Sequence, residues 1–321
     1  MSYSALTHRW PVFVLLLAAC VGLRQWDTPV ELQTWSRLAL DWTLVAVFLA
    51  IVVPLRRLGR ARALFFRTAR EQRDELVREV EMAARVQQHL LEQHRPPAGP
   101  LDVVARMHPA KVVGGDYYDF VPLDGQRFAV VVADVAGKGL PAALLMPAVK
   151  IALRTLAERE APIGELLGEL NRVFLDNLPP ASYFTLVYAV FDAAAGRLVY
   201  ANAGHPPPLH LKAPRGEEAW LMPEGPAVGL LHQDVRFETA EAHFEPGDLF
   251  VFYTDGITEA ENPSGADFGR ERLAATVRTV AGQPAEAVVS AVHGAADAFR
   301  GSSPRGDDAT VIVVRVPPAS S

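Results

Sequence analysis

The sequence predicts an α+β fold in which antiparallel sheets are covered by helices, preceded by N-terminal transmembrane helices and a long linker helix. Half of the 321 residues are apolar, which is enough for one or two globular domains with a core. Beyond residue 101, strand-like runs follow one another without room for a crossover helix, so neighbouring strands are antiparallel. Before residue 58, two apolar stretches are followed by a block of arginines. The net charge of −6 does not suggest a nucleic-acid partner, and the single cysteine excludes an internal disulfide.

Residues 1–57 have the pattern of a membrane anchor, with spans at about 10–26 and 38–55. Trp42 fits an interfacial position in the second span, for which a buried core helix is the alternative. The arginines that follow place the rest of the chain in the cytoplasm, at the cell inner membrane, by the positive-inside rule. The first stretch is either a second span or a signal segment, because "LAAC", ending at Cys20, resembles a lipoprotein processing box.

Residues 58–95 are predicted to form a helical linker. Apolar side chains recur at spacings of three and four along one narrow seam: Leu76, Val80, Ala83, Val86 and Leu90. This seam predicts either a coiled coil that joins two copies of the chain as a homodimer, or a helix packed on its own domain. Prolines at 96 and 97 end the helix. A globular domain at 96–317 and a tail at 318–321 complete the chain.

Within the globular domain, strands are expected where apolar and β-branched runs are bounded by Gly, Pro, Asp and Asn. These runs lie at residues 101–107, 127–134, 183–192, 197–203, 235–244, 248–255 and 309–316. Helical periodicity predicts helices at residues 140–159, 163–178, 269–280 and 284–300.

Aspartates stand beside glycines or at the edges of the apolar runs: Asp116, Asp134, Asp255, Asp307 and Asp308. One aspartate in a turn usually caps the backbone. Carboxylates gathered at neighbouring strand ends instead repel each other and lose solvation unless a cation lies between them. Oxygen ligands without a Cys or His cluster favour Mg²⁺ or Mn²⁺, and a pair of such ions sharing a hydroxide suits in-line attack on phosphorus. The pattern therefore favours a two-metal site.

The loop after Asp134, "VAGKG", also invites comparison with nucleotide-binding loops. It lacks the Gly-x-x-x-x-Gly-Lys-Ser/Thr of a P-loop. The stretch "GKGLPA" fits a dinucleotide motif loosely, but no acid-ended parallel βαβ unit follows it. Gly137 and Gly139 instead leave room for the carbonyl of Val135 to turn toward a metal.

The ordered segments of the domain resemble those of the bacterial RsbU/SpoIIE-like serine/threonine phosphatases, a branch of the metal-dependent protein phosphatase 2C superfamily. The resemblance runs from about Ala84 to Val316 and rests on "VVGGDYYDF", "VVADVAGKGLPAALLM", "YFTLVYAVFD", "YANAGHPPPLHL", "FVFYTDGITEAENPSGADFGRERL" and "GDDATVIVV". It implies an α-β-β-α sandwich with a dinuclear Mn²⁺ or Mg²⁺ site at one end of the two sheets.

The resemblance also implies roles for individual residues. Asp134 would bridge both metals, with the Val135 carbonyl as the neighbouring ligand. Asp255 and Asp307 would bind one metal, and Asp116 would act near the second metal through water.

Other positions match the family less directly. Asp307 is preferred to Asp308 as a ligand because it aligns with the first residue of the family's Asp-Asp/Asn pair. Ala136 stands where eukaryotic relatives have a histidine, so water or another side chain, for which Lys138 is a candidate, would protonate the leaving group. A family signature at Asn202, Gly204 and His205 is expected to be a structural turn.

The function implied is that of a membrane-anchored cytoplasmic phosphatase. It would hydrolyse phosphoserine or phosphothreonine on a phosphorylated signalling protein similar to STAS-type anti-anti-sigma factors. A dimeric coiled coil is expected to pass a signal from the membrane to the metal site. The alternative is a non-catalytic signalling scaffold that uses the phosphatase fold for binding. A sensor kinase is a weaker alternative, because neither His89 nor His94 begins a His-Glu/Asp pair.

Overall fold

The computed structural model describes residues 33–91, 99–111, 113–124, 127–137, 140–159, 161–177, 182–212, 215–222, 225–231 and 235–318. The first predicted span with Cys20, and also Lys138, lie outside these ranges. The chain divides into two compact units, Met1–Val77 and Arg78–Ser321.

A single helix, α3 (Gln33–Leu90), contains both the second predicted span and the linker, and it continues through Pro54. The linker was expected to run as far as residue 95, whereas α3 ends at Leu90. By length and composition, the helix from Leu40 onward is able to cross a membrane, and its apolar window is not buried within the protein.

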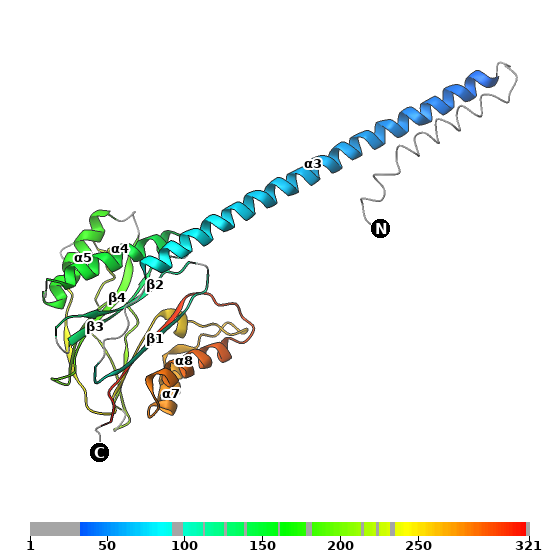
Figure 1. Cartoon of the computed structure of the whole chain (residues 1–321). Helices are drawn as coiled ribbons and strands as arrows, with labels where there is room; N and C mark the ends of the chain where they lie inside the picture. The colour runs from blue at the N-terminus through cyan, green and yellow to red at the C-terminus, as the bar shows by residue number, and fades with distance from the viewer. Residues whose placement is uncertain are drawn as a thin grey trace. The chain divides into compact units, whose positions relative to one another are not determined.

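The second unit contains two five-stranded antiparallel sheets (Figure 1). The β1 sheet has the order β1 (Asp102–His108), β10 (Ala309–Arg315), β9 (Leu249–Tyr253), β6 (Leu209–Lys212) and β7 (Glu217–Trp220). The β2 sheet has the order β2 (Asp116–Pro122), β3 (Arg127–Val135), β4 (Phe184–Asp192), β5 (Arg197–Ala203) and β8 (Ala240–His243).

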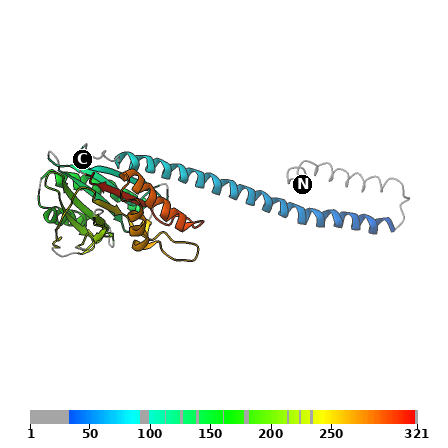
Figure 2. The same cartoon turned by 90° about the horizontal axis from the view of Figure 1, so that it is seen from below.

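Helices cover the outer face of each sheet, as Figures 1 and 2 show. Helices α4 (Leu140–Ala157) and α5 (Ile163–Asn177) lie on the β2 sheet, whereas α7 (Gly269–Val280) and α8 (Ala285–Arg300) lie on the β1 sheet. A one-turn helix, α6 (Asp255–Thr258), follows β9. The predicted α-β-β-α sandwich of antiparallel sheets is confirmed.

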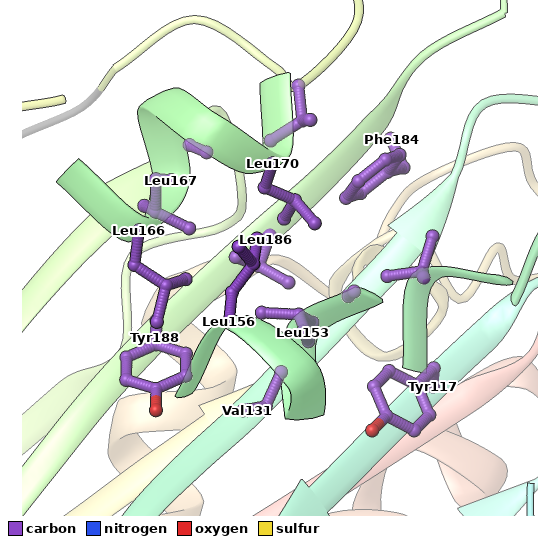
Figure 3. Close-up of a cluster of buried hydrophobic side chains, with 14 of the residues drawn as sticks. Tyr117, Val131, Leu153, Leu156, Leu166, Leu167, Leu170, Phe184, Leu186 and Tyr188 are labelled. Carbon is purple, nitrogen blue, oxygen red and sulfur yellow. The ribbon is translucent and has the colours of Figure 1, made fainter. Parts of the chain in front are cut away.

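The layers are held together by three apolar clusters. In β3, Val131 and Ala133 face α4 and α5, whereas Val130 and Val132 face the β1 sheet. Both faces of this strand are buried, which explains its unbroken apolar sequence. Figure 3 shows the first cluster, where leucines of α4 and α5 point toward aromatic and aliphatic side chains of the β2 sheet. The third cluster lies between α7, α8 and the β1 sheet.

The prediction of a strand over residues 235–244 is wrong for its first half, because β8 begins at Ala240. The preceding residues pack on α5 instead, where the backbone carbonyl of Phe237 fills the space that a Cβ of Gly164 would take. Strands β2, β6 and β7 were not expected. Strand β2 carries two buried aspartates, and β6 and β7 form a short hairpin with charged residues, so neither pattern is clearly apolar.

Candidate functional site

Two of the predicted carboxylates lie opposite each other on adjacent strands. Asp116 begins β2 and pairs with Asp134 near the end of β3. Residues paired in this way have Cβ atoms about 5 Å apart. Asp116 is 3% exposed. Burial raises the pKa of the Asp116 carboxyl well above its usual range, and the Asp134 and Asp308 charges add to this rise. A cation beside the two carboxylates would offset their mutual repulsion and the cost of burying the Asp116 charge.

Asp116 is also joined to the other sheet. The hydroxyls of Thr254 and Thr310 donate to Asp116 Oδ2 at 2.7 and 2.5 Å, and they oppose the rise in its pKa. The Thr310 backbone N–H donates to Thr254 Oγ1 at 3.0 Å. Thr254 directly precedes Asp255, so this network places the end of β9 beside Asp116. Sequence reasoning missed both threonines, although Thr254 and Thr310 each stand within two residues of a predicted aspartate and are fully buried.

The two neighbouring aspartates before β10 have different surroundings. Both oxygens of Asp308 accept backbone N–H groups, from Ala110 and Gly115, each at 2.7 Å. Asp308 is 4% exposed and therefore anchors the loop that leads into β2. Asp307 Oδ1 accepts the Asp308 N–H at 3.0 Å. The preference for Asp307 as a ligand stays a prediction, and the geometry gives Asp308 a structural task.

Glycines allow the loops to approach each other closely. A Cβ on Gly256, within α6, would lie 1.9 Å from the Asp308 carbonyl oxygen, so the turn that begins at Asp255 rests directly on the Asp307–Asp308 backbone. A Cβ on Gly115 would lie 3.3 Å from Asp134 Oδ1 and 3.7 Å from the Val135 carbonyl oxygen. These contacts place the predicted residues of four separate segments at one end of the two sheets.

The available donors are carboxylate and carbonyl oxygens, which suit Mn²⁺ or Mg²⁺. Within the part of the chain that the structure describes, no three His, Cys, Asp or Glu side chains form a group that could hold a metal ion. The donor chemistry and the pairing of buried Asp116 with half-buried Asp134 fit a divalent cation, whereas the ligand set stays a prediction. Ala136 has no titratable group, and its N–H donates to the Tyr183 carbonyl at 2.9 Å.

The expected turn at Asn202, Gly204 and His205 is present. Asn202 Oδ1 accepts the His205 N–H at 2.7 Å, and Asn202 Nδ2 donates to the His205 carbonyl at 2.8 Å. Gly204 has φ of +72°, a conformation that favours glycine.

The last turns of α3 also reach the site, through a residue, Gln87, that the sequence analysis did not single out. The buried Gln87 amide donates to the Gly114 carbonyl at 2.8 Å and to the Ala143 carbonyl at 2.9 Å. Gly114 lies two residues before Asp116, and Ala143 lies in the first turn of α4, after the loop that follows Asp134. A single side chain of α3 therefore bonds the backbone near Asp116 and the start of α4, the helix that follows the Asp134 loop.

Comparison of the chain with known proteins identifies its relatives. The chain is 36% identical over 198 residues to the phosphoserine phosphatase RsbU of Bacillus subtilis, which is 62% of this chain and 58% of the relative. The chain thus spans less than two thirds of that relative's length.

Solved structures share the fold. The SiaA-PP2C domain of Pseudomonas aeruginosa is 24% identical with a TM-score of 0.65, covering 76% of this chain and 98% of that one. The RsbU and RsbW domains of a Mycobacterium tuberculosis protein are 27% identical with a TM-score of 0.58, covering 68% of this chain and 60% of that one. A family model described as Stage II sporulation protein E (SpoIIE) matches residues 124–317, more than half of the chain. The chain therefore belongs to the SpoIIE family.

Proposed function

We propose that this chain is a metal-dependent phosphoprotein phosphatase that hydrolyses phosphoserine and phosphothreonine on a cytoplasmic signalling protein. The observation that supports it most is the gathering of aspartates from four separate segments at one end of the two sheets. Membership of the SpoIIE family and similarity to a phosphoserine phosphatase agree with this activity.

The residues that would hold two Mn²⁺ or Mg²⁺ ions are the carboxylates of Asp134, Asp255 and Asp307 and the carbonyl of Val135, with Asp116 near the second ion. The like-charge pair of buried Asp116 and half-buried Asp134 supports this assignment, because a nearby cation stabilises two neighbouring carboxylates. When bound, such ions supply a nucleophilic water of lowered pKa for in-line attack on phosphorus.

The protein's own groups would set the geometry and handle the proton. Thr254 and Thr310 hold the Asp116 carboxylate in one orientation through their hydroxyls. The departing serine or threonine oxygen needs a proton, and Ala136 has none to give. We assign this step to solvent water or Lys138.

The proposed substrate is a phosphorylated protein similar to STAS-type anti-anti-sigma factors. Its support is the similarity to RsbU of Bacillus subtilis, a phosphoserine phosphatase. Hydrolysis of such a phosphoprotein, but not of the same protein phosphorylated on tyrosine, would support this specificity.

We further propose that residues 1–57 anchor the chain in the inner membrane, that 58–95 form a linker able to pair with a second copy, and that 96–317 form the phosphatase domain, followed by a tail at 318–321. The apolar part of α3 supports the anchor. The Gln87 amide supports control through the linker, because it bonds the backbone beside Asp116 and beside the loop after Asp134. Equal turnover by monomeric and dimeric fractions of the full chain would contradict that control.

The activity is tested with the full chain in detergent micelles, supplied with Mn²⁺ or Mg²⁺ and with either an aryl phosphate or a phosphoserine peptide. Asp134→Asn and Asp255→Asn are each expected to lower turnover by at least about 100-fold, at the upper end of effects seen around metal sites. Asp192→Asn is the matched control, since Asp192 ends β4 and pairs with Arg127 at the start of β3, at the end of the strands far from Asp134. Full turnover by Asp134→Asn would refute the metal assignment, and an inactive wild type with either metal would favour a binding scaffold.

A further inference from the structure

A buried imidazole lies between the two sheets, behind the carboxylates of the candidate site. His205 is 2% exposed and follows β5, and the Asn202 side chain bonds both its N–H and its carbonyl. At Gly204, a side chain would come within 3.0 Å of the Ala227 nitrogen as well as being strained by the positive φ. The turn therefore holds His205 in one position.

The partners of the ring define its tautomer. His205 Nε2 lies 3.1 Å from the Tyr253 carbonyl oxygen, which can only accept, so Nε2 carries the hydrogen. His205 Nδ1 lies 2.7 Å from Thr185 Oγ1 and must then accept the threonine hydroxyl. Burial lowers the pKa of His205 to about 3, against the opposing effect of the Tyr253 carbonyl, which agrees with a neutral ring.

The two bonds end on opposite sheets, next to the candidate metal ligands. Thr185, on β4, is the direct cross-strand partner of Asp134. Its hydroxyl also lies 3.4 Å from the Asp134 carbonyl, but its single hydrogen goes to the nearer His205 nitrogen. Tyr253 ends β9, two residues before Asp255. The ring therefore connects the backbone beside Asp134 with the backbone beside Asp255.

A second connection between the sheets runs from Asp116 to Thr254 and Thr310. It fixes the edge strand β2, whereas the His205 connection acts on β4, on the other side of β3. Asp134 thus lies on the strand between the two connections. Each carboxylate position would shift if either connection were lost, because the apolar contacts between the sheets are less directional than hydrogen bonds.

We propose that His205 is a positioning residue, which sets the separation of Asp134 and Asp255 and so the affinity of the site for divalent cations. The inference rests on the metal site of the proposed function. His205 would exert its effect through Thr185 and Tyr253, without touching the ion or the phosphate.

The test measures Mn²⁺ binding to the full chain in detergent micelles by calorimetric titration, without substrate. His205→Phe fills the volume but forms neither bond, and it is expected to weaken Mn²⁺ binding about 10-fold or more, as outer partners of metal ligands do. Thr185→Val keeps the shape of the side chain and is expected to have a similar effect. His205→Gln offers one acceptor and one donor, so its affinity is expected to stay within about threefold of the wild type.

His210 provides a matched control. It is 1% exposed, contacts Asp248 through Nε2 at 3.0 Å and stacks on Phe250, but its strand β6 pairs with the part of β9 before Tyr253. His210→Phe is expected to lower the melting temperature without changing Mn²⁺ affinity. A folded His205→Phe with wild-type affinity would overturn the inference, as would equal weakening by His210→Phe. If His205→Phe does not fold, the Mn²⁺ affinity of Thr185→Val is the test, and a wild-type affinity of that variant would overturn the inference. A wild type that binds no Mn²⁺ would overturn the proposed metal site itself, whereas wild-type binding with no effect of these variants would overturn the His205 inference alone.

Discussion

Asp307 and Asp308, the adjacent aspartates before β10, should differ when substituted. Asp308→Asn should mainly lower stability, whereas Asp307→Asn should mainly impair the metal site. Asp308 accepts two backbone N–H groups at 2.7 Å, one on each carboxylate oxygen, and is buried. In Asp308→Asn, one N–H keeps an acceptor while the other faces an NH₂ group. Asp307→Asn keeps an oxygen for the Asp308 N–H, so the loop should be little changed.

The expected destabilisation of Asp308→Asn follows from these bonds. A hydrogen bond to a charged group contributes about 1.5–3 kcal/mol, and the variant loses one and weakens the other, so we expect about 3 kcal/mol. For a domain of this size, that corresponds to a fall in melting temperature of roughly 6–12 °C. Asp307→Asn should cost less than about 1 kcal/mol, because it removes charge but no backbone bond.

The assay combines thermal unfolding of each metal-free variant with Mn²⁺ titration and Mn²⁺-dependent hydrolysis of an aryl phosphate, at a temperature where both variants are folded. Asp307→Asn should lower hydrolysis by at least about 100-fold, whereas Asp308→Asn should lose no more than about 10-fold through displacement of the Gly115 loop. The reasoning is refuted if Asp308→Asn melts like the wild type yet loses Mn²⁺, or if Asp307→Asn melts early and remains active.

Further predictions concern packing, the buried ion pair and pH. Asp119 is fully buried and receives hydrogen bonds from Arg154 and Tyr117, which outweigh the effect of burial and hold the pKa of Asp119 below its usual range. Arg154→Leu removes the positive charge that faces this buried carboxylate and should cost about 3–5 kcal/mol in chemical denaturation. Gly256→Ala forces a methyl group against the Asp308 carbonyl and should cost about 1–3 kcal/mol in the same assay and lower turnover, because Asp255 begins that turn. Burial and the neighbouring His108 lower the pKa of His293 to about 4, so the folded state resists protonation that the unfolded chain accepts near pH 6.5. The free energy of unfolding should fall as pH decreases from 6.5 toward 4, and His293 should contribute about 2 kcal/mol of this fall once solvent screening is allowed for, so the fall should be smaller by that amount in His293→Phe.

Controls are available for each of these predictions. Arg159→Leu removes an exposed ion pair with Glu169 and should cost less than about 1 kcal/mol; an equal loss would contradict the importance of burial at Asp119. Gly282 has no atoms within 4 Å of an added Cβ, so Gly282→Ala should leave turnover unchanged. Identical pH profiles for the wild type and His293→Phe would show that another group causes the acid sensitivity.

Much of the fold could be predicted from local patterns. Helices α4, α5, α7 and α8 and strands β1, β3, β4, β5, β9 and β10 lie close to their expected ranges. These elements bury an apolar stripe or both faces of a strand, so their periodicity is visible in the sequence. Strand β2 could not be predicted in this way. Its buried Asp116 and Asp119 are compatible with the core because Thr254, Thr310 and Arg154 bond them, and these partners are remote in sequence.

The contrast between local patterns and contacts between remote residues applies to the candidate site as well. From the sequence alone we predicted the candidate aspartates, because carboxylates beside buried strands and glycine loops form a recognisable pattern, and we also predicted the family, which the match to the SpoIIE family model confirms. The tertiary structure decided the different surroundings of Asp307 and Asp308, the reach of Gln87 from α3, and the bridging position of His205. Hydrogen bonds depend on distance and direction in space. The partners of the Asp308 carboxylate, the Gln87 amide and the His205 ring lie between 20 and 198 residues away, so their pairing leaves no local pattern in the chain.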